Sequence, residues 1–369
     1  MKTGILTFHA SHNYGSMLQS YALQQTVLSL GHDCEIINFR TERQRRHYRP
    51  FYAKGGLRGI AKAIMYPQIA RNAKAKHRLF ERFLREELKV SEQEYATMEQ
   101  LDEARLPYDA IIAGSDQIWN TICFDHDRAF FLPFAPEGCR KIAYAPSMGP
   151  CPEEQVAKEY DAQIRADLES FSAISVREER TADRLETIIG RHPAVTVDPT
   201  LLLTRKQWQQ IIKPESIVKG DYILYYSPWN SDEVLQEATR LSEKFKMPIV
   251  VSNGFSVKWT HRRDLKIVNA VGPLEFLNLI SNARLVVSGS FHAAVFSLLF
   301  DRQLYAYDGT SDARVNSLLN ITGLQHVAQE PETLVDPTET ARLYAAGRQR
   351  LEPLRAESIK FLKNALNHD

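Results

Sequence analysis

The 369-residue chain lacks any long hydrophobic run, and no stretch reaches the roughly 18 apolar residues that a membrane-spanning helix needs. Its first residues lead directly into a strand-like pattern, without the basic and apolar regions of a secretory signal peptide. Cysteine is scarce, and the four residues form neither a C-x-x-C pair nor a zinc-ligand pattern: Cys34, Cys123, Cys139 and Cys151. These absences predict a cytoplasmic protein with reduced thiols.

The formal charge is nearly balanced at +1, but it is unevenly distributed. Residues 40–89 contain 15 Lys/Arg and 4 Asp/Glu, together with several aromatic residues. Such a basic segment favours an anionic partner, either a membrane surface or a lipid diphosphate. The alternative is a solvated helical face above core aromatics. Nucleic acid is disfavoured because no recognition motif accompanies the charge.

Short apolar runs alternate with segments of helical periodicity along the chain. Strands are predicted at residues 4–8, 34–39, 109–113, 141–145, 173–176, 222–226, 248–252, 284–288 and 303–307. Helices are predicted at 17–30, 178–189, 231–245, 273–281, 292–300 and 339–366. Strands joined through single helices form parallel sheets. The pattern therefore predicts an α/β protein with two doubly wound, Rossmann-like domains facing a cleft.

A proline and a glycine indicate where these domains end. Pro214 and Gly220 interrupt the alternation of predicted strands and helices, so we expect an N-terminal domain over 1–205 that includes a basic helical segment at 40–89. A C-terminal domain is expected over 221–335, followed by a helical tail at 336–369. Ligands of such sheets bind outside the carboxyl ends of the strands.

Two loops of the N-terminal half carry candidate acceptor-binding residues. His12 and Asn13 lie where the first strand turns into a helix, a position that favours anions, and the alternative for His12 is that it only caps or packs. Asp116, Gln117 and Trp119 follow a later strand. Their hydrogen-bonding groups and apolar ring suit a sugar. The alternative is an Asx turn whose tryptophan anchors the loop in the core.

An arginine and a histidine are the candidate reactive groups. Arg177 lies between a strand and a helix N-terminus, where the helix dipole disfavours a cation unless it holds an anion. The alternative is a salt bridge to Glu178, Glu179 or Asp183. His292 opens an apolar helix after a Ser-Gly-Ser-Phe turn, so it can donate a proton beside an anion pocket.

The surroundings of this histidine complete the candidate donor site. Ser290 and Phe291 belong to the same turn, and Arg314 follows a later strand and adds a positive group. The alternative for the turn is an N-capping serine beside a histidine with satisfied hydrogen bonds.

Seven segments of the chain resemble, in order, the bacterial polysaccharide pyruvyl transferase family. They are the opening GILTFHASHNYGSMLQSYALQQ at 4–25, AGSDQIWN at 113–120, KIAYAPSMG at 141–149, ISVRE at 174–178, VDPTLLL at 197–203, VGPLEFL at 271–277 and SFHAAVFSLLF at 290–300. The resemblance implies a fold like the GT-B glycosyltransferases and phosphoenolpyruvate as pyruvyl donor. It also implies ketal-pyruvylated sugars as products, with Arg177 and His292 in the donor site.

We therefore expect a transferase of polysaccharide or exopolysaccharide biosynthesis that uses phosphoenolpyruvate as co-substrate, with no cofactor and no metal. In this hypothesis Arg177 clamps the donor, His292 acts as acid, and Asp116 or His12 grips or deprotonates the acceptor. The acceptor is a sugar, either free or linked to polyprenyl diphosphate at the inner face of the membrane. The alternatives are a GT-B-type glycosyltransferase using a nucleotide sugar and a non-catalytic binder of an anionic carbohydrate.

Overall fold

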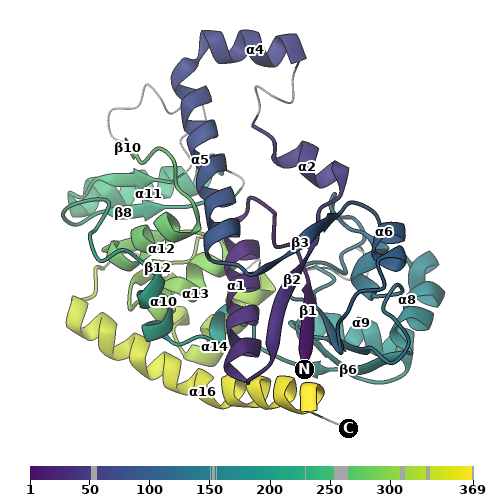
Figure 1. Cartoon of the computed structure of the whole chain (residues 1–369). Helices are drawn as coiled ribbons and strands as arrows, with labels where there is room; N and C mark the ends of the chain where they lie inside the picture. The colour runs from purple at the N-terminus through teal and green to yellow at the C-terminus, as the bar shows by residue number, and fades with distance from the viewer. Residues whose placement is uncertain are drawn as a thin grey trace. The chain divides into compact units, whose positions relative to one another are not determined.

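The computed structural model describes residues 1–50, 56–149, 151, 154, 156–228, 230–252, 265–307, 312–329 and 333–367. The chain divides into two compact units. The first comprises Met1–Arg49, Glu81–Leu203 and Pro353–Asp369, and the second comprises Pro50–Phe80 and Thr204–Glu352. Figure 1 shows the sheet and helices of each unit.

These limits differ from the predicted domains in two segments. Residues 50–80 of the basic segment belong to the second unit, and the C-terminal tail is divided at Pro353. One long helix runs through each of these dividing points, α5 (Pro67–Glu86) and α16 (Pro337–Asn367). Residues 51–55 of the basic segment lie outside the described residues.

The first unit contains a parallel sheet in the order β3-β2-β1-β4-β5-β6-β7. Its strands are β1 (Lys2–Leu6), β2 (Asp33–Phe39), β3 (Val90–Tyr95), β4 (Ala110–Ala113), β5 (Arg140–Ala143), β6 (Phe171–Val176) and β7 (Ala194–Val195). All predicted strands of this half are confirmed to within a few residues. The two edge strands, β3 and β7, were not predicted, because an exposed edge strand needs no continuous apolar run.

Helices cover this sheet on both faces. They are α1 (Tyr14–Ser29), α2 (Glu42–Tyr48), α6 (Met98–Glu103), α8 (Asp161–Leu168) and α9 (Glu179–Ile189), with short 3₁₀ turns η1 (Arg128–Phe131), η2 (Lys158–Tyr160) and η3 (Pro199–Leu201). Figure 1 shows α1 on one side of β1 and β2, and α8 and α9 on the other side of the sheet. Such two-sided cover is the doubly wound arrangement.

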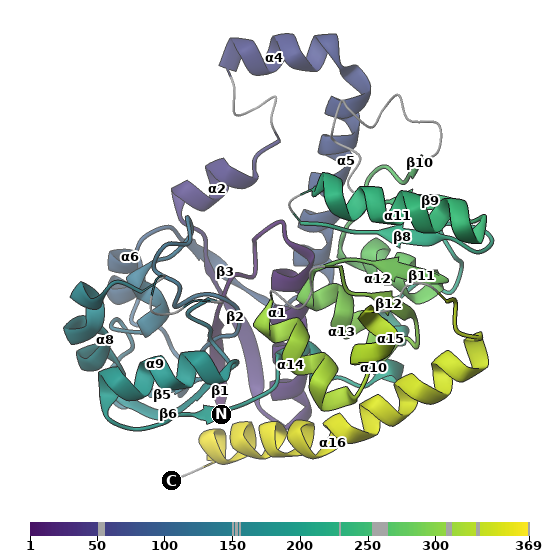
Figure 2. The same ribbon diagram turned by 180° about the vertical axis from the view of Figure 1, so that it is seen from behind.

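The second unit contains a smaller parallel sheet in the order β10-β9-β8-β11-β12. Its strands are β8 (Ile223–Tyr225), β9 (Ile249–Val251), β10 (Leu265–Ile267), β11 (Leu285–Val287) and β12 (Gln303–Tyr305). Its helices are α4 (Gly56–Met65), α10 (Arg205–Ile211), α11 (Asp232–Phe245), α12 (Pro273–Asn282), α13 (Phe291–Leu299), α14 (Ala313–Thr322) and α15 (Gln325–Gln329). Figure 2 draws α11 on one side of these strands and α12 and α13 on the other. Two doubly wound parallel sheets confirm the predicted fold class.

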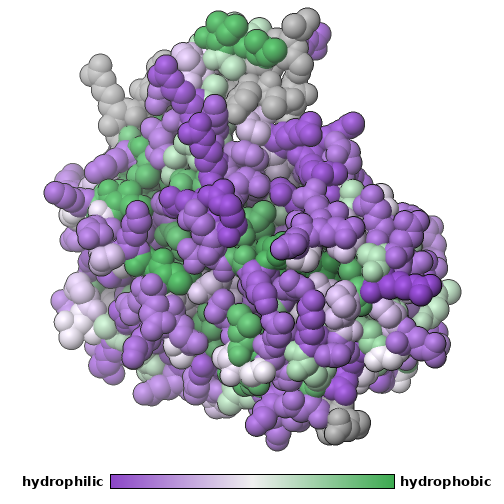
Figure 3. Space-filling model, viewed as in Figure 1, coloured by the Kyte–Doolittle hydropathy of each residue, from purple (hydrophilic) through white to green (hydrophobic). Residues whose placement is uncertain are grey.

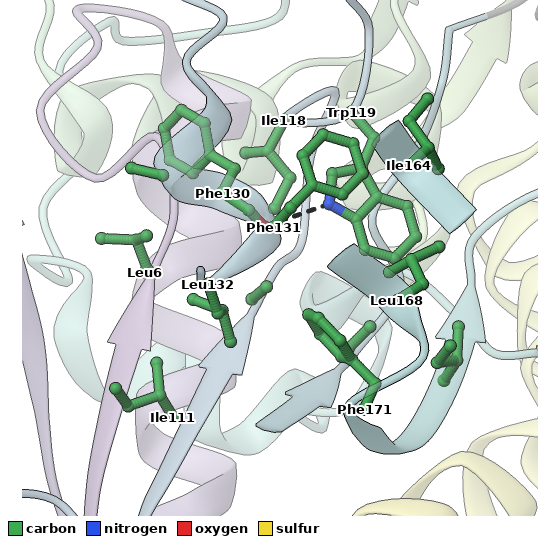
Figure 4. Packing of buried hydrophobic residues seen from close by; sticks show 14 of the residues in the cluster. Leu6, Ile111, Ile118, Trp119, Phe130, Phe131, Leu132, Ile164, Leu168 and Phe171 are labelled. Atoms are coloured by element: carbon green, nitrogen blue, oxygen red, sulfur yellow. Dashed lines mark hydrogen bonds between the residues drawn. The ribbon is translucent and has the colours of Figure 1, made fainter. Parts of the chain in front are cut away.

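The core of the first unit is built around an indole. Trp119 has no exposed surface, its Nε1 donates a hydrogen bond to the Phe130 carbonyl oxygen at 3.1 Å, and its ring stacks on Phe131 at 5.2 Å between centroids (Figure 4). Trp119 therefore cannot offer a face to a sugar, and the idea of a tryptophan sugar platform is wrong. The alternative, that this residue anchors its loop in the core, describes its position.

No helix among the described residues is both long enough and apolar enough to cross a membrane.

Candidate functional site

The carboxyl edge of the first sheet gathers polar side chains from four strands. Because β1, β4, β5 and β6 run parallel and pair in order, the loops that follow them meet at one edge. These loops begin at residues 7, 114, 144 and 177. This edge includes the position between β1 and β4 where the order of the strands reverses, which is where doubly wound sheets bind ligands.

Asp116 is at the centre of this edge and is almost fully buried. The Ser16 hydroxyl donates to Asp116 Oδ2 at 2.5 Å, and the Gln117 backbone N–H donates to Oδ1 at 2.8 Å. Its backbone adopts φ +71°, in the left-handed region that aspartate tolerates better than most residues. Just before it, Gly114 has φ +134°, and a Cβ there would lie 2.0 Å from the Tyr144 carbonyl oxygen. Only glycine fits at this approach.

Arg177 lies among three carboxylates. Its Nε contacts Glu178 Oε1 at 2.6 Å, and its Nη1 lies 3.0 Å from Asp198 Oδ2 and 4.0 Å from Asp116 Oδ1. Burial lowers the pKa of Arg177, but the three neighbouring negative charges raise this pKa by more than burial lowers it. The guanidinium therefore stays positive. The expected alternative, an ion pair with Glu178, is present, while Asp198 was not anticipated. The donor clamp stays a prediction.

Asp125 is a buried carboxyl group that sequence reasoning missed. The Ser11 hydroxyl donates to Asp125 Oδ2 at 3.4 Å, and Gln44 Nε2 donates to the same hydroxyl at 3.2 Å. Burial, and then the charge of Asp116, raise the pKa of Asp125 to about 6. Burial, and then the charges of Asp125 and Asp116, raise the pKa of the Cys123 thiol to about 12. Asp125 follows no strand and fits no motif, so the sequence offered no signal for it.

The other predicted residues of this unit have local partners. His12 Nε2 lies 3.0 Å from Glu81 Oε1, and its ring is 5.3 Å from the Tyr48 ring. Although burial opposes it, hydrogen bonds and charges from His12 and Arg40 hold the pKa of Glu81 at about 2. Asn13 is exposed and caps α1, its Oδ1 accepting from the Gly15 backbone N–H at 2.9 Å. A cap explains Asn13 without a ligand.

Gln117 also makes its side-chain contacts within its own loop, where its Oε1 accepts a hydrogen bond from Asn120 Nδ2 at 2.9 Å. His12, Asn13, Asp116, Gln117 and Arg177 thus all lie after the carboxyl ends of strands of this sheet, and their roles in binding stay predictions.

In the second unit, α13 begins directly after the central strand β11. The Ser288 hydroxyl accepts a hydrogen bond from the Ser290 backbone N–H at 3.1 Å, and Phe291 starts the helix. A Cβ on Gly289 would lie 2.8 Å from the Tyr307 carbonyl oxygen, so a larger residue would displace this turn. The turn brings backbone N–H groups of a buried, apolar helix to the sheet edge, where they favour an anion.

His292 and Arg314 flank the same phenyl ring. The His292 and Phe291 ring centroids are 5.3 Å apart, and the guanidinium of Arg314 lies over the Phe291 ring at 5.5 Å. Arg314 is itself held by Asp312, with contacts of 3.0 and 2.6 Å to the two carboxylate oxygens. The predicted donor residues Ser290, Phe291, His292 and Arg314 therefore form one cluster.

One group of residues with metal-type ligand atoms is exposed. Ligand atoms of Glu179, Asp183 and His192 lie within 4.8 Å of one another, and all three residues are exposed. Exposed acidic groups commonly gather without binding a metal, so this group supports no metal site. The expectation that the reaction needs no metal stays a prediction.

Solved structures share the fold of this chain. Staphylococcus aureus MnaA in complex with UDP is 9% identical with a TM-score of 0.54, and the match covers 94% of this chain and 90% of that one. A variant of Staphylococcus aureus TarM with fondaparinux, alpha-GlcNAc-glycerol and UDP is 10% identical with a TM-score of 0.52, covering 100% of both chains. At such low identity these likenesses show only the fold class, that of the GT-B glycosyltransferases.

A comparison with curated proteins finds no match. The family model for polysaccharide pyruvyl transferase, in contrast, matches residues 13–309. This range includes the carboxylates and arginine of the first unit and the start of α13 in the second. Since the match spans most of the sequence, the chain belongs to the polysaccharide pyruvyl transferase family.

Proposed function

We propose that this chain transfers the pyruvyl group of phosphoenolpyruvate to two neighbouring hydroxyls of a sugar, forming a cyclic ketal. The observation that carries the proposal is the family match over residues 13–309, which includes a carboxylate cluster and a helix start suited to an anion. Phosphoenolpyruvate is a co-substrate in this reaction, and no further cofactor is proposed.

The start of α13 is the proposed donor site. Backbone N–H groups at a helix N-terminus stabilise phosphate and carboxylate groups, and Arg314 adds a guanidinium beside Phe291. His292 is half-buried at this helix start. In the proposal it donates the proton that converts the enol carbon C3 into a methyl group and creates cation character at C2.

The atoms of this reaction balance without a redox partner. One sugar hydroxyl attacks C2, the C2–O bond to phosphate breaks, and a neighbouring hydroxyl closes the ring. Of the two hydroxyl protons released, one replaces the proton delivered to C3 and the other leaves on the phosphate. The chain therefore needs an acid, a base and a site for a polyanion.

The carboxylate cluster of the first unit is the proposed acceptor side. A general base must be ionised at the working pH and must still bind a proton readily. Asp125 meets both requirements with its pKa of about 6, so we propose it as the base. The Asp116 carboxylate accepts two hydrogen bonds and lies 4.0 Å from the Arg177 guanidinium, so its orientation is fixed. We propose that it orients the acceptor hydroxyls. Arg177 has three carboxylates around it, so we propose that it fixes the cluster as a positioning residue.

The acceptor is proposed to be a sugar of a polysaccharide or of its lipid-linked precursor, in keeping with the family. His12 remains a candidate acceptor-binding residue, although its partner Glu81 keeps the ring engaged.

Ligand-induced stabilisation is the first test. A ligand at about 100 times its dissociation constant raises the free energy of unfolding by about 2.7 kcal/mol, a shift that thermal unfolding resolves. We expect stabilisation by phosphoenolpyruvate and none by nucleotide sugars. Acceptor-dependent phosphate release, with the ketal identified by mass spectrometry, then tests turnover.

The other outcomes separate the alternatives. Stabilisation by a nucleotide sugar alone would identify a glycosyltransferase. Phosphoenolpyruvate binding without phosphate release across a broad panel of diol sugars would indicate a non-catalytic binder.

A further inference from the structure

The segment at residues 50–80, which belongs to the second unit, carries only positively charged side chains. It contains seven Lys/Arg, namely Lys54, Arg58, Lys62, Arg71, Lys74, Lys76 and Arg78, and no Asp or Glu. Every neighbouring segment of comparable length on this chain mixes both signs. A run of this kind attracts an anionic surface and has no acidic residues of its own to neutralise it.

The helix α4 in this segment exposes large apolar side chains. Ile60, Ile64 and Met65 are 53%, 75% and 66% exposed. Ile60 and Ile64 are four residues apart and so share one helix face, which Met65 widens. In Figure 3 hydrophobic residues gather at the top of the view, where Figure 1 draws α4. Exposure of three large apolar side chains to water within six residues is unfavourable. This face of α4 is therefore suited to contact an apolar partner.

The next helix, α5, is fixed to the second unit and adds exposed cations. Asn72 is buried and its Nδ2 donates to Asn269 Oδ1 at 2.7 Å, which ties α5 to the segment after β10. Arg71, Lys74 and Arg78 are exposed on α5 at spacings of three and four residues, so they lie along one face. Arg58 is exposed on α4 itself.

We propose that α4 docks on the surface of an anionic lipid bilayer. Ile60, Ile64 and Met65 enter the interface between headgroups and acyl chains, while Arg58 and the cations of α5 contact the anionic headgroups. Amphipathic helices with basic residues beside an apolar face bind membranes in this way, by combining apolar burial with electrostatic attraction. A bilayer explains the apolar face and the single sign of charge together. The proposal does not depend on the pyruvyl transfer reaction.

Vesicle flotation of the full chain tests this docking. With vesicles of phosphatidylcholine and phosphatidylglycerol at low salt, we expect the protein to float. We expect flotation to fall at least tenfold with phosphatidylcholine alone or at high salt. A variant with Ile60→Ser, Ile64→Ser and Met65→Ser should bind at least tenfold more weakly to the anionic vesicles.

Two further variants make the test specific. Ile217→Ser with Ile321→Ser removes exposed apolar residues elsewhere in the second unit and should float as the wild type does. Arg71→Gln, Lys74→Gln and Arg78→Gln together should reduce flotation while α4 stays unchanged. Circular dichroism confirms that each variant is folded.

Three results would overturn the proposal. The first is wild-type protein that stays unbound with anionic vesicles, and the second is a triple serine variant that floats undiminished. The third is a wild-type dimer in light scattering that the triple serine variant abolishes while neither protein floats. That last result would show that a second copy of the chain covers α4.

Discussion

The two candidate clusters differ in charge and in how it is held. At the first-unit edge, Asp116, Glu178 and Asp198 lie around Arg177, the charges of Asp125 and Asp116 interact, and all are largely buried. The second-unit cluster has a helix N-terminus, a histidine, and an Arg314 that one carboxylate balances. A trianion such as phosphoenolpyruvate is repelled by the first arrangement and accommodated by the second. The difference teaches that a conspicuous buried arginine need not be the donor site.

His292→Ala should produce the largest effect. Loss of a positioned acid typically lowers the rate by about 10²–10⁴. Because His292 is half-buried at the start of a helix, the variant should fold and still bind phosphoenolpyruvate. Acceptor-dependent phosphate release measures turnover, and His326→Ala, an exposed histidine of the same unit, is the control. Full turnover in His292→Ala would show that His292 is not the general acid.

Arg177→Ala should mainly destabilise the fold. Removing one partner of a buried ion pair leaves its carboxylates uncompensated, which costs about 3–5 kcal/mol. Chemical unfolding measures this loss. Arg180→Ala, three residues later in the first turn of α9, is the control, and as an exposed position it should cost less than about 1 kcal/mol.

The same variant distinguishes two roles of Arg177, which are to bind phosphoenolpyruvate directly or to orient the surrounding carboxylates. If Arg177→Ala keeps its stability but loses phosphoenolpyruvate affinity more than tenfold, the arginine holds the donor and the contrast between the two clusters is wrong.

Much of this picture was accessible from the sequence, because buried parallel strands and apolar helices leave regular patterns. The strands ending at Ala113 and Val287, and with them the loops that carry Asp116 and Ser290, were predicted. The edge strand β3 was not, because only its last side chain is buried and it shows no apolar run.

Site details depended on contacts between distant segments, which local patterns do not record. Trp119 and Asp116 are three residues apart, yet one lies in the core and the other at the edge. Asp198 approaches Arg177 across 21 residues, and Asp125 approaches Ser11 across 114. Nothing in the loop around Asp125 distinguishes it from a solvated aspartate.

Asp125→Asn should make the protein more stable and less active. The pKa of Asp125 is raised from 3.8 to about 6, so the folded state binds this proton more tightly than the unfolded chain does. The free energy of unfolding therefore falls as pH rises from about 4 to about 6, by on the order of 2–3 kcal/mol, and this contribution is constant above. Asparagine removes that penalty at pH 7.5 while still accepting the hydrogen bond from Ser11.

Unfolding at pH 5 and pH 7.5 tests the stability half of this prediction, with Asp102→Asn, an exposed carboxylate of the same unit, as control. For activity, we expect the rate of the wild type to rise with pH through about 6 as the base ionises. The variant should lose about 10² in rate together with this rise. A pH dependence that survives in Asp125→Asn would place the base elsewhere in the cluster.

Arg314→Met should have the smallest effect, and it tests the second cluster directly. Arg314 is partly exposed and bound to Asp312, so its removal should cost little stability, about 1 kcal/mol or less. If the guanidinium also meets the donor, the KM for phosphoenolpyruvate should rise about five- to tenfold with kcat nearly unchanged. Arg342→Met is the matched control, because Arg342 forms a similar two-contact pair with Glu339 on α16. Equal KM values in both variants would leave the start of α13 as the donor site without Arg314, since backbone N–H groups alone would then hold the anion.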